Sequence, residues 1–596
     1  MRNQKAFALI LVILIMNVLF SQEARHLIIS PAEFASAAEE LTAFSLAEYG
    51  AEREIYLIED ILSTDYGTAD TLKLFLENYF SDPEIDLEMS SVLLLGGGTT
   101  DWTNGIERNR IPVYIQYNMA SDGMFVDFDG DNLPDVAIGR IPASNIEDLE
   151  IYLAKYYDYI TETEAGSWQR KLLFCADDEM RHEELEGYSS NAMNHSYMTD
   201  QLIAAIDEDY IFQQVYGIDY EMDDEGKKPE AESTIIQKIN DGVNLWVYTG
   251  HASNVVLGDE DYFRFDDVSE LSNIGKEPFM FSASCRTGEF QFQTPCLPEL
   301  LMFADNGGII GGVFASYDSS PVSNNNMGSM MLSLLYDDDY RWGNGLNEAK
   351  RESSASAMNS KKFNLFGDPL GIVRKGDSEN LILEPEITNL YPGEGNLLGW
   401  NCGIEYETGI FEIKEADEWI EYNHTIENQT YEYNRWRPGN IVNLGTAEVI
   451  DGRAEYVAFL HEGMIEGNDG QVICWALDIA GTADFYFSDD IIIGENNGNE
   501  DDIVDGVIQI SNYPNPFNPS TMIRYYLPEV GKSEVNIYNI KGEKVICLRN
   551  GVEEAGWHEC EWEGKDRNGK NMSSGIYLMQ VRSKDMVVNG KLNLLK

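Results

Sequence analysis

Short apolar runs alternate with helix-forming segments from residue 25 to about residue 374, and this alternation narrows the fold most. Leu27-Ile28-Ile29 precedes a helical pattern that opens at Pro31 and ends at Gly50. Further apolar runs lie at 55–58, 92–95, 172–175, 211–215, 243–248, 278–281 and 308–314. Strands that alternate with helices pair in parallel, and the helices cover both faces of the sheet. The pattern therefore predicts an α/β fold with a mainly parallel sheet flanked by helices.

The pattern changes after this α/β region. Between residues 377 and 494, short segments of alternating polar and apolar residues predict a β-sandwich. Residues 495–507 form a polar, acidic linker, and residues 508–596 again predict an all-β domain. A chain of 596 residues exceeds what one hydrophobic core serves. We expect two α/β subdomains, 23–165 and 166–376, followed by two Ig-like sandwich domains.

The N-terminal segment has the features of a secretory signal. Arg2 and Lys5 supply positive charge ahead of the apolar stretch from Ala6 to Phe20. That stretch is too short to span a bilayer comfortably, so residues 1–21 are predicted to be a signal peptide rather than an uncleaved anchor. No later apolar run has the length of a membrane-spanning helix. The sequence therefore predicts a secreted protein.

Acidic residues strongly outnumber basic ones. There are 103 Asp and Glu residues against 41 Lys and Arg residues, for a formal net charge of −62. This excess repels nucleic acids and anionic membrane surfaces, so neither is an expected partner. It favours bound cations, calcium in particular.

Cysteine spacing gives less information. The seven cysteines include no C-x-x-C pair, which argues against structural zinc or haem attachment. Their odd number leaves at least one thiol unpaired within the chain. Cys402 with Cys474, and Cys547 with Cys560, could form disulfides within their own domains.

His251 and Cys285 each follow one of the apolar runs directly. Ligands of open α/β sheets bind at the carboxyl ends of the strands, where a thiol and an imidazole could meet as nucleophile and base. Cys285 could attack a peptide carbonyl to form a thioester, and His251 could protonate the leaving amine. The backbone N–H groups of Cys285 and Ala252 could hold the oxyanion. The alternative is a chance pair, because the chain has seven residues of each type.

The flanking residues resemble the gingipain family of caspase-like, secreted cysteine peptidases. The motifs are Tyr248-Thr249-Gly250-His251, Ser282-Ala283-Ser284-Cys285-Arg286-Thr287-Gly288 and Phe363-Asn364-Leu365-Phe366-Gly367-Asp368-Pro369. The resemblance covers about residues 25–375 and implies a caspase-like fold that cleaves proteins or peptides without a catalytic cofactor. It implies that Cys285 is the nucleophile, His251 the catalytic histidine and Asp178 the acid that orients it, with Asp177 as a possible substitute.

Two positions depart from the family pattern. Ala252 stands where the family usually has Gly. Arginine-specific members carry an acid shortly before the helix near His195, where this chain has Asn191-Ala192-Met193-Asn194. Because this segment lacks an acid, the sequence does not favour specificity for arginine. Two alternatives to a peptidase are a catalytically silent surface adhesin and a sorting transpeptidase.

A second motif contains Asp127, Asp129, Asp131 and Asp135 around a turn at Gly130. Alternating carboxylates of this kind can converge on calcium, which takes six to eight oxygen ligands. The loop lacks the glutamate at position twelve of an EF-hand. We expect structural calcium here, with a solvated acidic turn as the alternative.

The C-terminal region carries a third set of motifs. Tyr513-Pro514-Asn515-Pro516-Phe517-Asn518-Pro519 is followed by Lys541-Gly542 and Ser574-Gly575-Ile576-Tyr577-Leu578. This combination resembles the C-terminal sorting domain of type IX secretion cargo. It implies export across an outer membrane by the type IX machinery, often with cleavage and attachment to the cell surface. The alternative is an ordinary Ig-like module.

Overall fold

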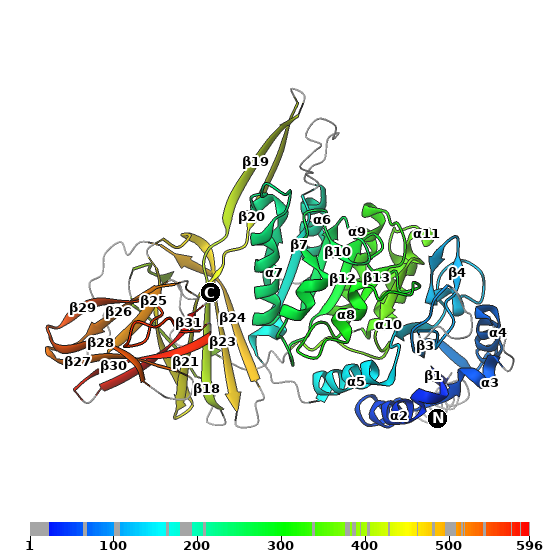
Figure 1. The fold of residues 1–596 in the computed structure, drawn as a ribbon, viewed down its shortest axis with the longest axis horizontal. Helices are drawn as coiled ribbons and strands as arrows, with labels where there is room; N and C mark the ends of the chain where they lie inside the picture. The colour runs from blue at the N-terminus through cyan, green and yellow to red at the C-terminus, as the bar shows by residue number, and fades with distance from the viewer. Residues whose placement is uncertain are drawn as a thin grey trace, which may run out of the picture. The chain divides into compact units, whose positions relative to one another are not determined.

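The structure is a computed structural model, shown in Figure 1. It describes residues 23–594 except for 63–67, 101–107, 162–165, 179–193, 207–209, 337–339, 376–381, 384–388, 394, 402–405, 427–428, 462, 479–482, 495–507, 514–516, 518, 540–543, 574 and 585. The predicted signal peptide and acidic linker therefore lie outside the described residues. The chain divides into two compact units. One extends to Lys375 and includes Tyr422–Tyr433, and the other contains Gly376–Glu421 and Asn434–Lys596.

The first unit is built on a ten-stranded sheet with the order β2-β1-β3-β6-β14-β13-β12-β9-β7-β8. The strands are β1 (Glu23–Ser30), β2 (Arg53–Leu57), β3 (Ile85–Leu95), β6 (Ala137–Ile141), β7 (Lys171–Ala176), β8 (Ile211–Tyr216), β9 (Leu245–Gly250), β12 (Phe279–Ser284), β13 (Gly311–Ala315) and β14 (Phe363–Phe366). All neighbours pair in parallel except β13 and β14, which are antiparallel. The predicted mainly parallel sheet is confirmed, and the two expected α/β subdomains share it.

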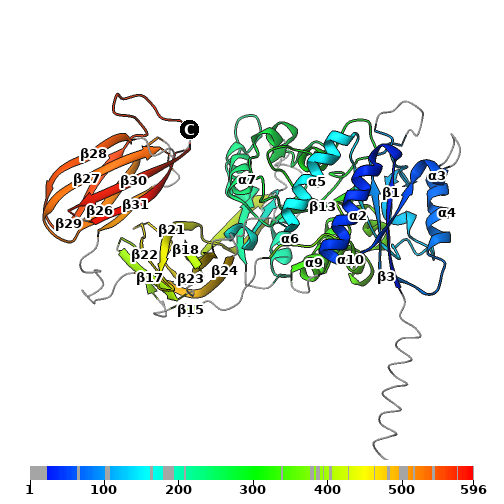
Figure 2. The ribbon, with the colours of Figure 1, turned by 90° about the horizontal axis from the view of Figure 1, so that it is seen from below.

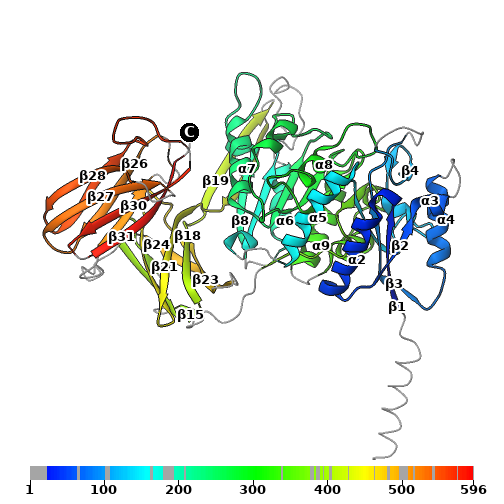
Figure 3. The same ribbon diagram turned by 60° about the horizontal axis from the view of Figure 1, so that its bottom comes forward.

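Helices cover both faces of this sheet, as the alternation predicts. They are α2 (Ala35–Tyr49), α3 (Ile58–Leu62), α4 (Ala69–Tyr79), α5 (Ile146–Thr161), α6 (Asn194–Ile203), α7 (Pro229–Asp241), α8 (Leu297–Met302), α9 (Pro321–Tyr336), α10 (Trp342–Glu352) and α11 (Ala357–Ser360). In β1, Ile28 joins the core that contains α2 and α5, whereas Leu27 and Ile29 join the core that contains α3 and α4. Figure 3 shows α2 on one side of β1–β3 and α3 and α4 on the other. Alternate side chains of a strand point to opposite faces, which explains this division.

The strands that precede His251 and Cys285 are buried along their whole length. Every residue of β9 and of β12 is buried, including Trp246 and Phe281. Each large apolar side chain buried in this way contributes roughly 1.5–3 kcal/mol. Burial on both faces explains the apolar residues with which both strands begin, and it gives the loops that follow them a firm base.

The second unit contains strands and no helix among its described residues. One eight-stranded sheet has the order β15-β17-β22-β21-β18-β23-β24-β16. Its strands are β15 (Ile382–Leu383), β16 (Asn389–Leu390), β17 (Gly395–Asn401), β18 (Tyr406–Lys414), β21 (Ile441–Ile450), β22 (Arg453–Phe459), β23 (Gly467–Asp478) and β24 (Ala483–Ile493). A separate hairpin is formed by β19 (Glu418–Ile426) and β20 (Gln429–Arg437), and its segment Tyr422–Tyr433 belongs to the first unit. Trp400, Phe411 and Cys474 lie in the core of this region.

The C-terminal strands form two smaller sheets around one core (Figure 2). The first holds β25 (Gln509–Tyr513), β26 (Thr521–Leu527) and β29 (Gly556–Trp562), and the second holds β27 (Gly531–Asn539), β28 (Lys544–Glu553), β30 (Gly575–Ser583) and β31 (Met586–Leu594). Among the residues described, no helix is long and apolar enough to cross a membrane.

The suggested disulfide between Cys547 and Cys560 is wrong. Both thiols are free, because Cys560 is buried in the C-terminal core whereas Cys547 is exposed on β28. Cys474 is also free and buried, and its suggested partner Cys402 lies outside the described residues.

Candidate active site

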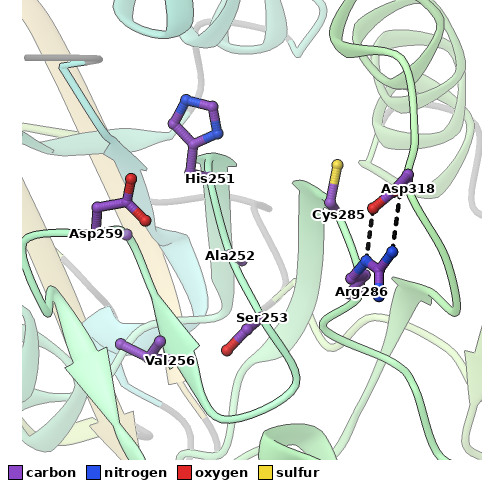
Figure 4. Close-up of a pocket in the computed structure, with 9 residues that line it drawn as sticks. His251, Ala252, Ser253, Val256, Asp259, Cys285, Arg286 and Asp318 are labelled. Carbon is purple, nitrogen blue, oxygen red and sulfur yellow. Dashed lines mark hydrogen bonds and ion pairs between the residues drawn. The ribbon is translucent and has the colours of Figure 1, made fainter. Parts of the chain in front are cut away.

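Two neighbouring strands bring His251 and Cys285 to the same edge of the sheet. β9 and β12 pair in parallel, and the last pair in their register is Gly250 with Ser284. His251 and Cys285 are therefore the first residues beyond two adjacent carboxyl ends, and Figure 4 shows their side chains projecting to the same side. Gly250 is required here, because a Cβ at this position would lie 2.5 Å from the Cβ of Asp177.

A pocket of about 290 Å³ opens between the two residues. It is lined by His251, Ala252, Ser253, Val256, Gly258, Asp259, Cys285, Arg286 and Asp318. Ala252 also pairs with Leu257 in an isolated bridge that anchors the pocket wall. The pocket thus has both chemically active side chains and a predicted oxyanion donor in its wall.

Cys285 differs from the buried cysteines of the chain. Its thiol is partly exposed, and the backbone N–H of Ser319 donates to its Sγ at 3.3 Å. By contrast, burial raises the pKa of Cys175 to about 12 and raises the pKa of Cys296 well above the usual range of a thiol. Those two thiols are therefore poor nucleophiles at neutral pH.

Arg286 forms the wall of the pocket next to Cys285. Its Nε and Nη2 atoms donate to the two carboxylate oxygens of Asp318 at 2.6 and 3.0 Å. The hydrogen bond to Asp318 raises the pKa of Arg286 and lowers that of Asp318. The backbone of Arg286 has a φ of 59°, a left-handed value that is uncommon for a residue with a side chain. This conformation occurs immediately after the candidate nucleophile.

Sequence reasoning missed Asp318 and Ser319. Both follow β13, the strand that pairs with β12 on the side away from β9. The same rule that selected His251 and Cys285 could have found them, since polar residues that follow a buried strand lie at the ligand-binding edge. The predicted strand at 308–314 supplied that signal.

The structure favours Asp177 over Asp178 as the acid beside His251. Both acids follow β7, which pairs with β9. Asp177 Oδ2 accepts the backbone N–H of His251 at 2.7 Å, and the Asp177 carboxylate lies within 4.8 Å of an imidazole nitrogen of His251. Asp178 is instead buried in an ion pair with Lys228. The two acids therefore differ in their partners, although their carboxylates lie within 4.8 Å of each other.

His195 is a further histidine in this region. It lies in α6, and its ring meets the ring of His251 edge-on with centroids 5.2 Å apart. Its Nδ1 atom lies 3.5 Å from Oδ1 of Asp177. The segment that precedes it, including Asn191-Ala192-Met193, lies outside the described residues, so the specificity prediction stays a prediction.

Glu260 adds a third buried carboxyl group behind His251. Its carboxylate lies within 4.8 Å of those of Asp177 and Asp178. Burial, followed by the charges of these two acids, raises the pKa of Glu260 to about 8, although the charge of Lys228 opposes the shift. The raised pKa means that Glu260 keeps its proton at neutral pH.

The titration of Glu260 predicts a specific dependence of stability on pH. The pKa of Glu260 is raised on folding, so its stabilising effect is complete below about pH 4.5 and is lost as the pH rises toward 8. Glu260→Gln removes this loss, and its Tm relative to wild type should therefore increase steadily from pH 5 to pH 8. Thermal denaturation across this range tests the prediction, with the exposed Glu225→Gln as control. A Tm difference that does not change with pH would contradict it.

The acidic loop brings three of its four predicted ligands together. The carboxylates of Asp127, Asp129 and Asp135 lie within 4.8 Å of one another, whereas Asp131 is not part of this group. Burial, together with the charges of the neighbouring carboxylates, raises the pKa of Asp135. Three converging carboxylates of like charge fit a hard divalent cation.

The same loop is stabilised by its own backbone. Asp127 accepts the N–H groups of Gly130 and Asn132 at 2.8 and 3.2 Å, and Asp135 accepts that of Phe128 at 2.7 Å. Asp131 accepts the N–H of Leu133 at 2.8 Å. The turn is thus held in a shape that presents carboxylate oxygens on one side.

A mainly parallel α/β sheet with a thiol and an imidazole at neighbouring strand ends is the arrangement of the caspase-like cysteine peptidases. The model of peptidase family C25 matches residues 20–371, which is more than half of the chain. The chain therefore belongs to peptidase family C25. A second model, the FlgD Ig-like domain, matches residues 519–586.

Individual relatives agree with this assignment. Gingipain R2 of Porphyromonas gingivalis strain W83 is 26% identical over 296 residues, which are 49% of this chain and 36% of that protein. Gingipain R1 of Porphyromonas gingivalis is 28% identical over 268 residues, which are 45% of this chain and 24% of that protein. The chain thus spans about a third or less of the length of these relatives. The solved complex of the RgpB pro- and mature domains matches 79% of this chain and all of that chain at 19% identity, with a TM-score of 0.50, and shows the fold.

Proposed function

We propose that the chain is a secreted cysteine endopeptidase that cleaves proteins or peptides with Cys285 and His251. The register that pairs Gly250 with Ser284 carries this proposal, because it leaves the imidazole and the thiol at adjacent strand ends beside one pocket. The partial exposure of Cys285 and the N–H of Ser319 on its sulfur also support a reactive thiol.

The reaction has two stages. His251 holds the proton of Cys285, and the thiolate adds to the substrate carbonyl to form a tetrahedral oxyanion. The N–H groups of Cys285 and Ala252 stabilise that oxyanion. The intermediate collapses as the C–N bond breaks, and His251 gives its proton to the leaving amine, which leaves a thioester on Cys285. His251 then takes a proton from water as the water oxygen adds to the thioester carbonyl. The C–S bond breaks, the carboxylic acid product departs, and His251 returns the proton to the sulfur of Cys285.

Asp177 orients His251 in this proposal, in place of Asp178. Its carboxylate accepts the backbone N–H of His251 and lies within 4.8 Å of a ring nitrogen, and a carboxylate in this place stabilises the imidazolium that forms during the reaction. Asp178 has a supporting role through its ion pair with Lys228.

Profiling against a peptide library tests the activity. Wild-type protein with calcium and a thiol reductant is compared with Cys285→Ala. Cleavage by wild type alone supports the peptidase and reveals the residue preferred before the scissile bond. If neither protein cleaves and Cys285 resists thiol-reactive probes, the silent adhesin is favoured. Joining of peptides in place of hydrolysis would favour the transpeptidase.

Secretion and surface attachment belong to the same proposal. The signal-like residues 1–21 and the match of residues 519–586 to an Ig-like domain are consistent with an exported protein whose C-terminal domain is read by the type IX machinery. Expression of the chain with and without residues 508–596 in a type IX-competent host tests this role. Export that does not depend on these residues would contradict it.

We also propose a structural calcium ion bound by Asp127, Asp129 and Asp135. Calcium that binds only the folded state raises stability, by about 2.7 kcal/mol at a concentration 100 times its Kd. Asp129→Asn should therefore reduce the rise in Tm that calcium produces, since the Asp129 carboxylate lies in the cluster. Asp131→Asn is the matched control and should retain most of the rise. Equal calcium shifts in both variants and wild type would contradict the site.

A further inference from the structure

Asp177, His195 and His251 converge from three separate elements. Asp177 follows β7, His195 lies in α6 and His251 follows β9. One ligand atom from each, a carboxylate oxygen and two imidazole nitrogens, lies within 4.8 Å of the other two. Asp177 and His195 are only 1% and 4% exposed. Two of the three donors are thus buried, and the set approaches the arrangement that a metal ion requires.

The distance between His195 and Asp177 is compatible with two ligands of one metal ion. His195 Nδ1 and Asp177 Oδ1 are 3.5 Å apart, longer than the usual 2.7–3.2 Å of an N–H···O bond. Ligands about 2.0–2.1 Å from a tetrahedral zinc ion are separated by roughly 3.3 Å. Two imidazoles and one carboxylate are also a ligand set that zinc takes when its fourth position remains open.

The surroundings hold the Asp177 carboxylate in place. Asp178, the next residue, forms an ion pair with the buried Lys228. The other oxygen of Asp177 accepts the backbone N–H of His251. The hydrogen bond on Oδ2 fixes the orientation of the Asp177 carboxylate, so that Oδ1 lies toward His195. Hydrogen bonds of this kind orient metal ligands in known sites.

We propose that Asp177, His195 and His251 bind a divalent transition-metal ion such as Zn²⁺, and that the bound ion switches off the peptidase. A metal on the nitrogen of His251 that belongs to this group fixes the tautomer of the ring, with the proton on the other nitrogen, so the imidazole can no longer act as a base. The regulatory effect rests on the proposed peptidase function, whereas metal binding does not. The predicted inhibition is reversible, since removal of the ion restores the free imidazole of His251 as the base for Cys285.

Binding is tested first without the thiol. Co²⁺ absorption and Zn²⁺ competition with a chromogenic chelator are measured on Cys285→Ala, with excess calcium to occupy the acidic loop. Adding His195→Asn keeps a donor toward Asp177 but removes a metal ligand, and should weaken zinc binding at least about 10–100-fold. Adding His558→Asn, a histidine of β29, is the matched control and should change nothing. Equal zinc affinity with and without His195 would overturn the site.

Inhibition is tested separately. Zinc should inhibit peptide cleavage by wild type at concentrations at least about tenfold lower than it inhibits His195→Asn, each measured against its own activity without zinc. Equal inhibition of both would assign the effect to Cys285 and His251 alone and overturn the regulatory role. If the wild type cleaves no peptide, the peptidase proposal fails while the binding result still decides the metal site. His195→Gln repeats both measurements if His195→Asn does not fold.

Discussion

Cys285→Ala should lower kcat/KM for peptide cleavage by about 10⁴–10⁶-fold, because the substitution removes the atom that bonds to the substrate. His251→Ala should cost a similar factor, and the double variant little more, since nucleophile and base act as one unit. Steady-state kinetics on the peptide found by library profiling measures these effects.

The matched control for Cys285 is Cys547→Ala. Cys547 is an exposed free thiol in the C-terminal domain, so its removal should leave kcat/KM within a factor of two or so of wild type. Cys285→Ala protein that keeps more than about a tenth of wild-type activity would show that the nucleophile lies elsewhere.

Asp177→Asn and Asp178→Asn should separate two roles that the sequence cannot distinguish. Asp177→Asn should lower kcat by about 10²–10⁴-fold, because the amide cannot stabilise the imidazolium of His251 as a carboxylate does. Asp178→Asn should act mainly on stability. It leaves the buried ammonium of Lys228 without its ion pair, a change that costs about 3–5 kcal/mol.

The two readouts are kcat on the chosen peptide and the free energy of unfolding in urea. The assignment of Asp177 holds if its variant loses activity with a smaller loss of stability and the Asp178 variant shows the reverse. A larger fall in kcat for Asp178→Asn, measured below its unfolding transition, would return the orienting role to Asp178.

Much of the catalytic unit could be predicted because buried parallel strands have continuous apolar sequences. β9 and β12 begin with such apolar runs, and position singled out the residues that follow these strands, His251 and Cys285. The flanking motifs, through their resemblance to the gingipain family, then favoured this pair over a chance pair. The acidic loop could be predicted for a similar reason, since alternating carboxylates around Gly130 form a local sequence pattern. Asp131 nevertheless lies outside the observed cluster, because its carboxylate caps the turn at Leu133.

The choice between Asp177 and Asp178 had no local signal. The residues are adjacent and carry the same charge, and their roles depend on partners 74 and 50 positions away, His251 and Lys228. The group formed by Asp177, His195 and His251 was hidden for the same reason, because α6 contributes its histidine from a part of the chain that no periodicity connects to β9.

By itself, the sequence determined the α/β class, the β-rich C-terminal region and the two strand ends that carry the imidazole and the thiol. These features follow from hydrophobic periodicity, which is encoded in neighbouring residues. Only the tertiary structure decided which acid meets His251 and which histidine lies beside it. The order β12-β9-β7-β8 places β7 next to β9 although β8 comes between them in the chain. Such an order depends on how helices and strands pack in three dimensions, and no local pattern of residues records it.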